Sequence, residues 1–119
     1  DKQGGVVLEI TPSTVEVRRP EDGVCPCTNH FRTPELAIDK RCWRYDRLSN
    51  IPAGSKIGLP EMAKKLHEVN QGSLQTMVFE PATLKLHLAI GKCPTSALPM
   101  RALELGPLFK AETPAAVEE

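Results

Sequence analysis

The stretch that decides the fold is LQTMVFEPATLKLHLAI, residues 74–90. Its second run places an aliphatic side chain at every other position from Leu84 to Ile90, and its first run, residues 74–79, alternates with the same period of two. A period of two is typical of β-strands, because successive side chains of a strand point to opposite faces. Pro81 lies between the runs and favours a turn. The stretch therefore predicts an antiparallel hairpin at the centre of a sheet.

A second hairpin is predicted nearer the start of the chain. Residues 6–10 and residues 14–18 also alternate with a period of two. The turn signal TPS, residues 11–13, separates the two runs. We expect these runs to pair as antiparallel strands.

Two helices are predicted between the hairpins. Residues 59–69 carry apolar side chains at helical spacing, and Pro60 suits a first turn because the N–H that it lacks would have no partner there. Another helix is expected over residues 41–48. Thr33 as a cap, followed by Pro34, predicts a further helical turn.

The order of strands, loop, helices and strands predicts an α+β domain, with helices packed on one face of an antiparallel sheet. We assign residues 1–110 to this domain, and residues 103–109 form its short last element. Residues 111–119 have little to bury and are expected to form a flexible tail.

The composition excludes several kinds of partner. A chain of 119 residues has the length of one ordinary domain. Fifteen basic side chains balance fifteen acidic ones, so the charge gives no sign of a nucleic-acid partner. No apolar run approaches the roughly 20 residues that span a bilayer, so no membrane partner is expected. The chain starts with Asp1 rather than Met, which favours a piece of a longer protein. The compartment stays open.

The segment CPCTNHF, residues 25–31, gathers two thiols, an amide and an imidazole on one predicted loop. Three of its side chains could bind a metal ion together with a further thiol: Cys25, Cys27 and His30, with Cys42 or Cys93. Zinc sites, however, favour gaps of two to four residues between paired cysteines, and this gap is a single proline. A redox pair would need two intervening residues. No thiol is singled out as a nucleophile, so we expect structural cysteines, no metal and no cofactor.

Three arginines, Arg41, Arg44 and Arg47, recur at intervals of three and line one face of the predicted helix. By itself this pattern is typical of a solvated face with salt bridges. Trp43 and Tyr45 on the same segment are expected to pack against the sheet.

Residues 28–31, TNHF, resemble the Thr-Asn-His-Phe segment of the C45 peptidase family, the acyl-coenzyme A:6-aminopenicillanic-acid acyltransferase-like N-terminal-nucleophile hydrolases. The wider choloylglycine hydrolase and penicillin V acylase group is similar. Residues 44–48, RYDRL, resemble the Arg-aromatic-x-Arg segment of that group. Residues 75–91 look like its late hairpin, which ends in a Gly-x-x-Pro turn, here GKCP. The resemblance covers roughly residues 5–110.

The resemblance implies a four-layer αββα sandwich that cleaves itself to expose an N-terminal cysteine. That thiol attacks an amide or thioester carbonyl, and its own α-amino group acts as the base. Asn29 matches the family residue that helps to form the oxyanion site, where the loss of a donor typically costs roughly 10²–10³ in rate. Arg44 matches an arginine near the nucleophile, where a fixed cation would hold the thiol as thiolate. Thr28 and His30 flank the asparagine and are expected to position it.

The family nucleophile lies well upstream of this motif, whereas only 27 residues precede Thr28 here, and the first of them is Asp1. We therefore expect a C-terminal fragment or subunit that supplies oxyanion and orienting residues but not the cysteine nucleophile, and that is inactive alone. Its expected partners are the N-terminal remainder of the same protein or further copies of itself, and a small acyl-amide or acyl-thioester substrate. Half of a sandwich would leave an apolar sheet face exposed.

Two alternatives stay open. The first is a non-catalytic interaction module of the same fold, in which loss of Asn29 would leave hydrolysis unaffected. The second is a metal-binding module that uses Cys25, Cys27 and His30, and metal analysis of the purified protein would distinguish it.

Overall fold

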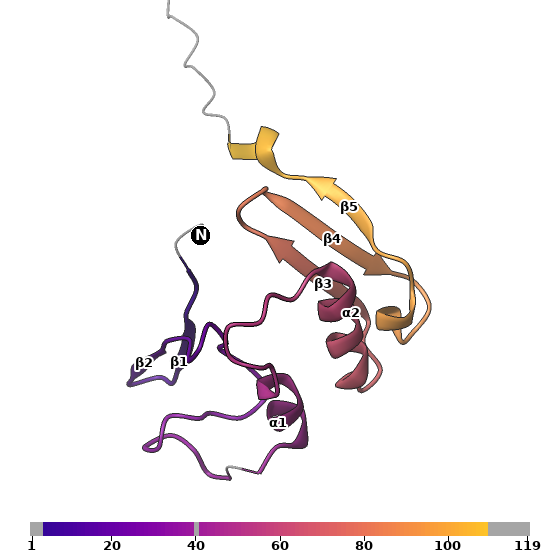
Figure 1. Ribbon diagram of the computed structural model, residues 1–119. Helices are drawn as coiled ribbons and strands as arrows, with labels where there is room; N and C mark the ends of the chain where they lie inside the picture. Colours follow the sequence, from indigo (N-terminus) through magenta and orange to yellow (C-terminus); the bar gives the residue numbers. More distant parts are fainter. Residues whose placement is uncertain (1–3, 40, 110–119) are drawn as a thin grey trace, which may run out of the picture.

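The computed structural model describes residues 4–39 and 41–109, and Figure 1 shows how its elements follow one another. Two antiparallel sheets and two α-helices place the chain in the predicted α+β class. The elements in chain order are β1 (Val7–Ile10), β2 (Val15–Arg18), α1 (Trp43–Ser49), α2 (Leu59–Glu68), β3 (Gln75–Glu80), β4 (Lys85–Ile90), the short 3₁₀ helix η1 (Thr95–Ala97), β5 (Arg101–Glu104) and a second 3₁₀ helix, η2 (Gly106–Phe109). The predicted tail, residues 111–119, lies outside the described residues.

β1 and β2 form the predicted first hairpin. Thr11 closes its turn, because its Oγ1 atom accepts a hydrogen bond from the backbone N–H of Thr14 at 3.0 Å. The two faces of this small sheet differ. One face carries Glu9 and Arg18. The other face is apolar and exposed, and it consists of Leu8 and Ile10 of β1 with their partners Val17 and Val15 of β2.

Both predicted helices are present, and their ends lie within about two residues of the expected ones. The backbone N–H of Gly58 donates to Oε2 of Glu61 at 3.1 Å, which satisfies a group that the start of α2 would otherwise leave unpaired. The predicted turn at Thr33 also forms. The N–H groups of Leu36 and Ala37 donate to its carbonyl at 3.0 and 2.9 Å, and the helical geometry ends there.

β3, β4 and β5 form a three-stranded antiparallel sheet in that order, so the predicted second hairpin is confirmed as β3 and β4. β4 is the central strand. Leu86 of β4 lies between Phe79 of β3 and Leu103 of β5. The single element predicted over residues 103–109 is instead the end of β5 followed by η2.

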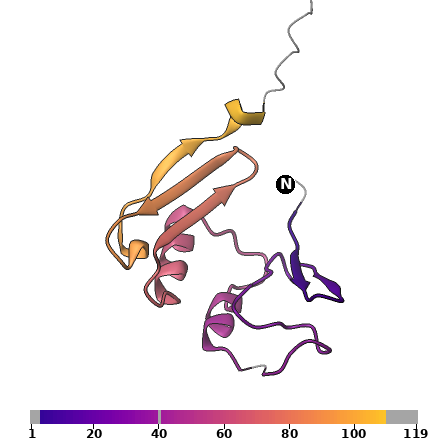
Figure 2. The same cartoon turned by 180° about the vertical axis from the view of Figure 1, so that it is seen from behind.

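The two faces of this sheet have different neighbours. α2 and η1 contact β3 on one face, and α2 lies beside β3 in both views (Figures 1 and 2). Thr76 and Ala89 are buried on this covered face. The opposite face, named here the open sheet face, is mostly apolar, and Phe79 of the edge strand β3 is 48% exposed on it. Its apolar residues are Met77, Phe79, Leu86, Leu88, Ile90 and Leu103, and Gln75 and Arg101 lie at one end of the same face.

The predicted packing of helices on one face of the sheet applies to α2, whereas α1 packs against α2. The predicted packing of Trp43 against the sheet is wrong, because this side chain is 54% exposed. Tyr45 instead lies beneath the guanidinium of Arg32, 3.7 Å from its ring centre, in a cation–π contact. In the part of the chain that the structure describes, no helix has the length and apolar character needed to cross a bilayer.

Thr95 joins η1 to the start of β3. Its side chain is fully buried, and its Oγ1 atom donates to the carbonyl of Ser73 at 3.1 Å. The same oxygen lies 3.1 Å from Oγ1 of Thr76, whose hydroxyl can donate to it. One hydroxyl therefore satisfies two polar groups beneath the covered face of the sheet.

Thr95→Val is expected to lower the free energy of unfolding by about 1–3 kcal/mol, because it leaves the Ser73 carbonyl and the Thr76 hydroxyl buried with one partner fewer. Denaturant unfolding followed by circular dichroism measures this change. Thr83→Val removes an exposed hydroxyl that donates to Glu80 at 3.0 Å, and this control should cost less than about 0.5 kcal/mol. Equal losses of unfolding free energy in the two variants would contradict the stabilising role of the buried Thr95 hydroxyl.

Candidate functional site

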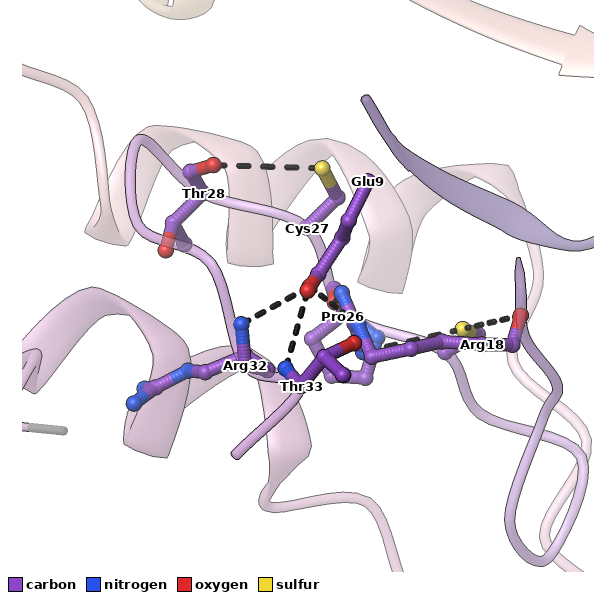
Figure 3. A network of polar contacts seen from close by, with 8 residues as sticks. Glu9, Arg18, Pro26, Cys27, Thr28, Arg32 and Thr33 are labelled. Atoms are coloured by element: carbon purple, nitrogen blue, oxygen red, sulfur yellow. Dashed lines mark hydrogen bonds and ion pairs between the residues drawn. The ribbon is translucent and has the colours of Figure 1, made fainter. Parts of the chain in front are cut away.

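A buried ion pair on the first hairpin anchors the loop that carries the predicted site residues. The Glu9 side chain is 3% exposed, and its Oε1 atom accepts a hydrogen bond from Nε of Arg18 at 2.6 Å. The carboxylate also accepts the backbone N–H groups of Arg32 and Thr33, each at 2.8 Å. Arg18 in turn donates from Nη2 to the carbonyl of Pro26 at 2.8 Å. Figure 3 shows Glu9 between Arg18 and the backbone of Arg32 and Thr33.

The surroundings of Glu9 keep its carboxylate ionised. Burial raises the pKa of Glu9, but the hydrogen bonds from Thr33, Arg32 and Arg18 outweigh this effect, and the pKa falls from 4.5 to about 2. For Arg18, burial acts to lower the pKa, and the hydrogen bond and charge of Glu9 raise it by more. Both partners therefore remain charged in the folded chain.

The two residues predicted to be catalytic, Asn29 and Arg44, meet in the folded chain. Nη2 of Arg44, in the first turn of α1, donates to Oδ1 of Asn29 at 3.0 Å. The guanidinium therefore binds the carbonyl oxygen of the Asn29 amide. The NH₂ group of the amide then points away from Arg44 and can donate a hydrogen bond to another group. Asn29 is exposed and Arg44 is half-buried. An oriented N–H donor beside a cation can stabilise a developing oxyanion.

Thr28, predicted to support Asn29, contacts a thiol. Its Oγ1 atom lies 3.5 Å from Sγ of Cys42, the buried residue that precedes α1. The Thr28 hydroxyl lowers the pKa of Cys42 most, followed by the N–H of Tyr45, and His30 adds to the effect. Burial opposes them, and the pKa falls from 9.0 to about 6. This cluster distinguishes Cys42 as a thiol with thiolate character near neutral pH.

Two open hollows flank the contact between Asn29 and Arg44. The first, of about 360 Å³, lies between β1 and residues 27–31 and is lined by Asn29. The second, of about 640 Å³, is lined by Arg44 and by Trp43 at the start of α1. His30 lines both hollows. Small molecules therefore have access to the site from two sides.

The cysteines of the CPCTNHF segment do not gather around a common point. Nη1 of Arg18 lies 3.9 Å from Sγ of Cys25, and Cys27 is exposed. Across residues 4–39 and 41–109, no group of three or more His, Cys, Asp or Glu side chains is arranged to bind a metal ion. The geometry of the described residues therefore gives the metal-binding alternative no support.

Glu9 and Arg18 have no predicted role, and Cys42 is predicted only as a possible metal ligand or a structural thiol, although all three contact the loop that carries Asn29 or the groups beside it. A signal for Glu9 exists in the sequence, since it is the only charged residue in the run VVLEI. Cys42 carries no such signal, because the hydroxyl beside it comes from Thr28, fourteen positions away.

The chain matches no protein-family model, and comparisons with curated proteins and with solved structures give no match either. The contacts described above are therefore the basis for a proposed function.

The stability of the chain is expected to depend on the charge of Glu9. Because the pKa of Glu9 is lower in the folded chain (about 2) than its ordinary 4.5, its contribution to the free energy of unfolding is fully present above about pH 5 and is lost as the pH falls toward 2. Glu9→Gln is expected to lower the free energy of unfolding at neutral pH by about 3 kcal/mol. It should also flatten the dependence on pH in this acidic range, measured by denaturant unfolding.

Glu16→Gln is the control, because Glu16 lies opposite Glu9 in the hairpin. It should change the free energy of unfolding at neutral pH, and the dependence of that energy on acidic pH, only slightly. An acidic pH dependence that stays the same in Glu9→Gln would contradict the role assigned to Glu9.

Proposed function

We propose that this chain is the C-terminal portion of an N-terminal-nucleophile amidohydrolase or acyltransferase similar to the C45 peptidases. In this proposal it supplies an oxyanion donor and an orienting cation, and the attacking cysteine belongs to the preceding part of the same protein. The contact between Asn29 and Arg44, 3.0 Å long and open to solvent, is the observation that carries the proposal. The substrate is a small acyl amide or acyl thioester, and the reaction uses no metal or cofactor.

The proposed chemistry needs a donor at the place where charge develops. When a thiolate attacks an amide or thioester carbonyl, negative charge builds up on the carbonyl oxygen. The NH₂ group of Asn29 donates to that oxygen, and Arg44 keeps the amide in the required orientation. The guanidinium also favours the thiolate form of an incoming cysteine. The two hollows beside the contact offer room for the acyl group and the leaving group.

The open sheet face supports the sandwich that the proposal requires. In a four-layer αββα sandwich, each sheet has helices on one face and the other sheet on its second face. Here α2 covers one face of the β3–β4–β5 sheet, and the second face is apolar and exposed. Among the described residues, Cys42 and Ala89 are the only buried apolar residues, which is few for this chain length. The proposed missing layer is the N-terminal remainder of the protein or, without it, another copy of the chain.

A non-catalytic interaction module of the same fold is the second candidate. It is favoured by the same open sheet face, since a surface of this kind commonly marks a binding site for another protein. The two candidates differ in whether Asn29 takes part in a reaction.

In the complete protein, Asn29→Ala is expected to lower kcat by about 10²–10³-fold, because the donor to the developing oxyanion is lost. Steady-state kinetics on a panel of chromogenic acyl amides and acyl thioesters measures this effect. Asn50→Ala, which removes an exposed amide at the end of α1, is the control. Full activity in Asn29→Ala would favour the non-catalytic module. An initiator codon directly before Asp1 in the gene would mean that no cysteine precedes this chain, and it would contradict the proposed function.

The chain alone is expected to self-associate through the open sheet face, because Met77, Phe79 and Ile90 of this face are exposed among the described residues. Phe79→Glu places a charge on the exposed apolar part of this face and should shift sedimentation toward the monomer, while the helical circular dichroism signal stays the same. Phe109→Glu on η2 is the matched control, because Phe109 is also exposed, at 67%, and should still permit association. A wild-type chain that remains monomeric at every concentration tested would contradict the proposal that a further layer covers this face.

A further inference from the structure

We propose that the ion pair of Glu9 and Arg18 is a positioning device for Asn29, which it keeps in contact with Arg44. The catalytic part of this inference rests on the proposed function, whereas its structural part concerns the loop and can be tested separately.

The loop has little else to hold it. Among the described residues, no backbone-to-backbone hydrogen bond involves residues 26–31, so no turn or strand pairing of its own holds this segment in place. Arg18 binds its start through the carbonyl of Pro26, and Glu9 binds the N–H groups just after its end. The two halves of one ion pair therefore hold the two ends of the loop, with Asn29 between them.

The side chains of the loop make contacts in the other direction, toward α1. Oγ1 of Thr28 approaches Sγ of Cys42 at 3.5 Å, and Oδ1 of Asn29 accepts from Arg44 at 3.0 Å. The loop thus lies between the hairpin and the start of α1. Its backbone is bonded to the hairpin, and its side chains contact Cys42 and Arg44. If the backbone were released, the exposed amide of Asn29 would retain only a single surface hydrogen bond, which contributes about 0.5–1.5 kcal/mol.

The ion pair suits this task because its bonds are charge-assisted and shielded from water. Hydrogen bonds to an ionised carboxylate are about twice as strong as those between neutral groups. Glu9 is 3% exposed and the side chain of Arg18 is 17% exposed. An oxyanion donor must be oriented before the reaction starts, and a displacement of about 1 Å can cost about 10²-fold in rate. Glu9 therefore acts through Asn29 and contacts no substrate itself.

The structural part is tested by NMR spectroscopy of the full chain. The wild type is expected to show cross-relaxation between the guanidinium protons of Arg44 and the amide protons of Asn29. Glu9→Gln keeps the shape of the side chain but removes its charge, so this signal should be lost while the signals of α2 persist. Glu16→Gln, across the hairpin, should retain the signal. Arg18→Lys is the second variant should Glu9→Gln not fold, because one ammonium group cannot reproduce both guanidinium bonds, and it should lose the signal as well.

The catalytic part is tested in the complete protein by a double-mutant cycle. Glu9→Gln is expected to lower kcat by about 10²-fold and to change KM little. In the Asn29→Ala background the same change should cause no further loss, because a residue that acts through Asn29 has nothing left to position. A general loss of structure would instead lower kcat in both backgrounds.

The outcomes separate the two ideas. Persistence of the cross-relaxation signal in the folded Glu9 and Arg18 variants would overturn the positioning role, whatever the activity. Equal losses of kcat with and without Asn29 would also overturn it. Loss of the signal together with a non-additive cycle would support it. If Asn29→Ala itself leaves every hydrolysis unaffected, the proposed function fails, and the NMR result still decides whether Glu9 positions the loop.

Discussion

The buried carboxylate of Glu9 is the interaction on which the arrangement of the first half of the chain depends. It lies in β1, pairs with Arg18 of β2 and accepts the two backbone N–H groups that follow the site loop. A carboxylate loses several kcal/mol of hydration when it is buried, and only a complete set of donors restores this loss. The hairpin and the loop are therefore compatible in one arrangement, in which all of these donors reach the same carboxylate.

That arrangement brings several functional groups together on the side of α1. Asn29 meets Arg44, and Thr28 meets Cys42, so an amide, a guanidinium and a thiol with a lowered pKa lie at the start of one short helix. The contact orients the amide of Asn29 without desolvating it. An exposed, oriented donor suits a site that is completed by a group from another part of the protein.

The two sheets share a further property, since each has one occupied face and one apolar face that is exposed. In the hairpin, the face with Glu9 holds the loop, while Leu8 and Val17 face away from it. In the second sheet, α2 covers the face with Thr76 and Ala89, and the open sheet face is exposed. Exposing this much apolar surface is unfavourable in water, which is why a further layer belongs to the proposed function.

The sequence by itself determined the local elements. A period of two predicts both hairpins, helical spacing with Pro60 predicts α2, and the TNHF motif together with a resemblance singled out Asn29 and Arg44. The signals for the hairpins and for α2 are local, because each depends on residues within one turn or one strand of one another. β5 escaped prediction, since its sequence Arg-Ala-Leu-Glu places its two apolar side chains next to each other and shows no alternation.

Only the tertiary structure decided which sheet face is covered, and which polar groups the site depends on. Alternation separates the two faces of a strand but does not say which one a helix will contact, and here α2 covers the less apolar face. Glu9 is bonded to backbone groups 23 and 24 positions away, and Cys42 to a hydroxyl 14 positions away. Such pairings arise because a buried polar group must find partners in space, and chain folding alone determines which distant donors are within reach.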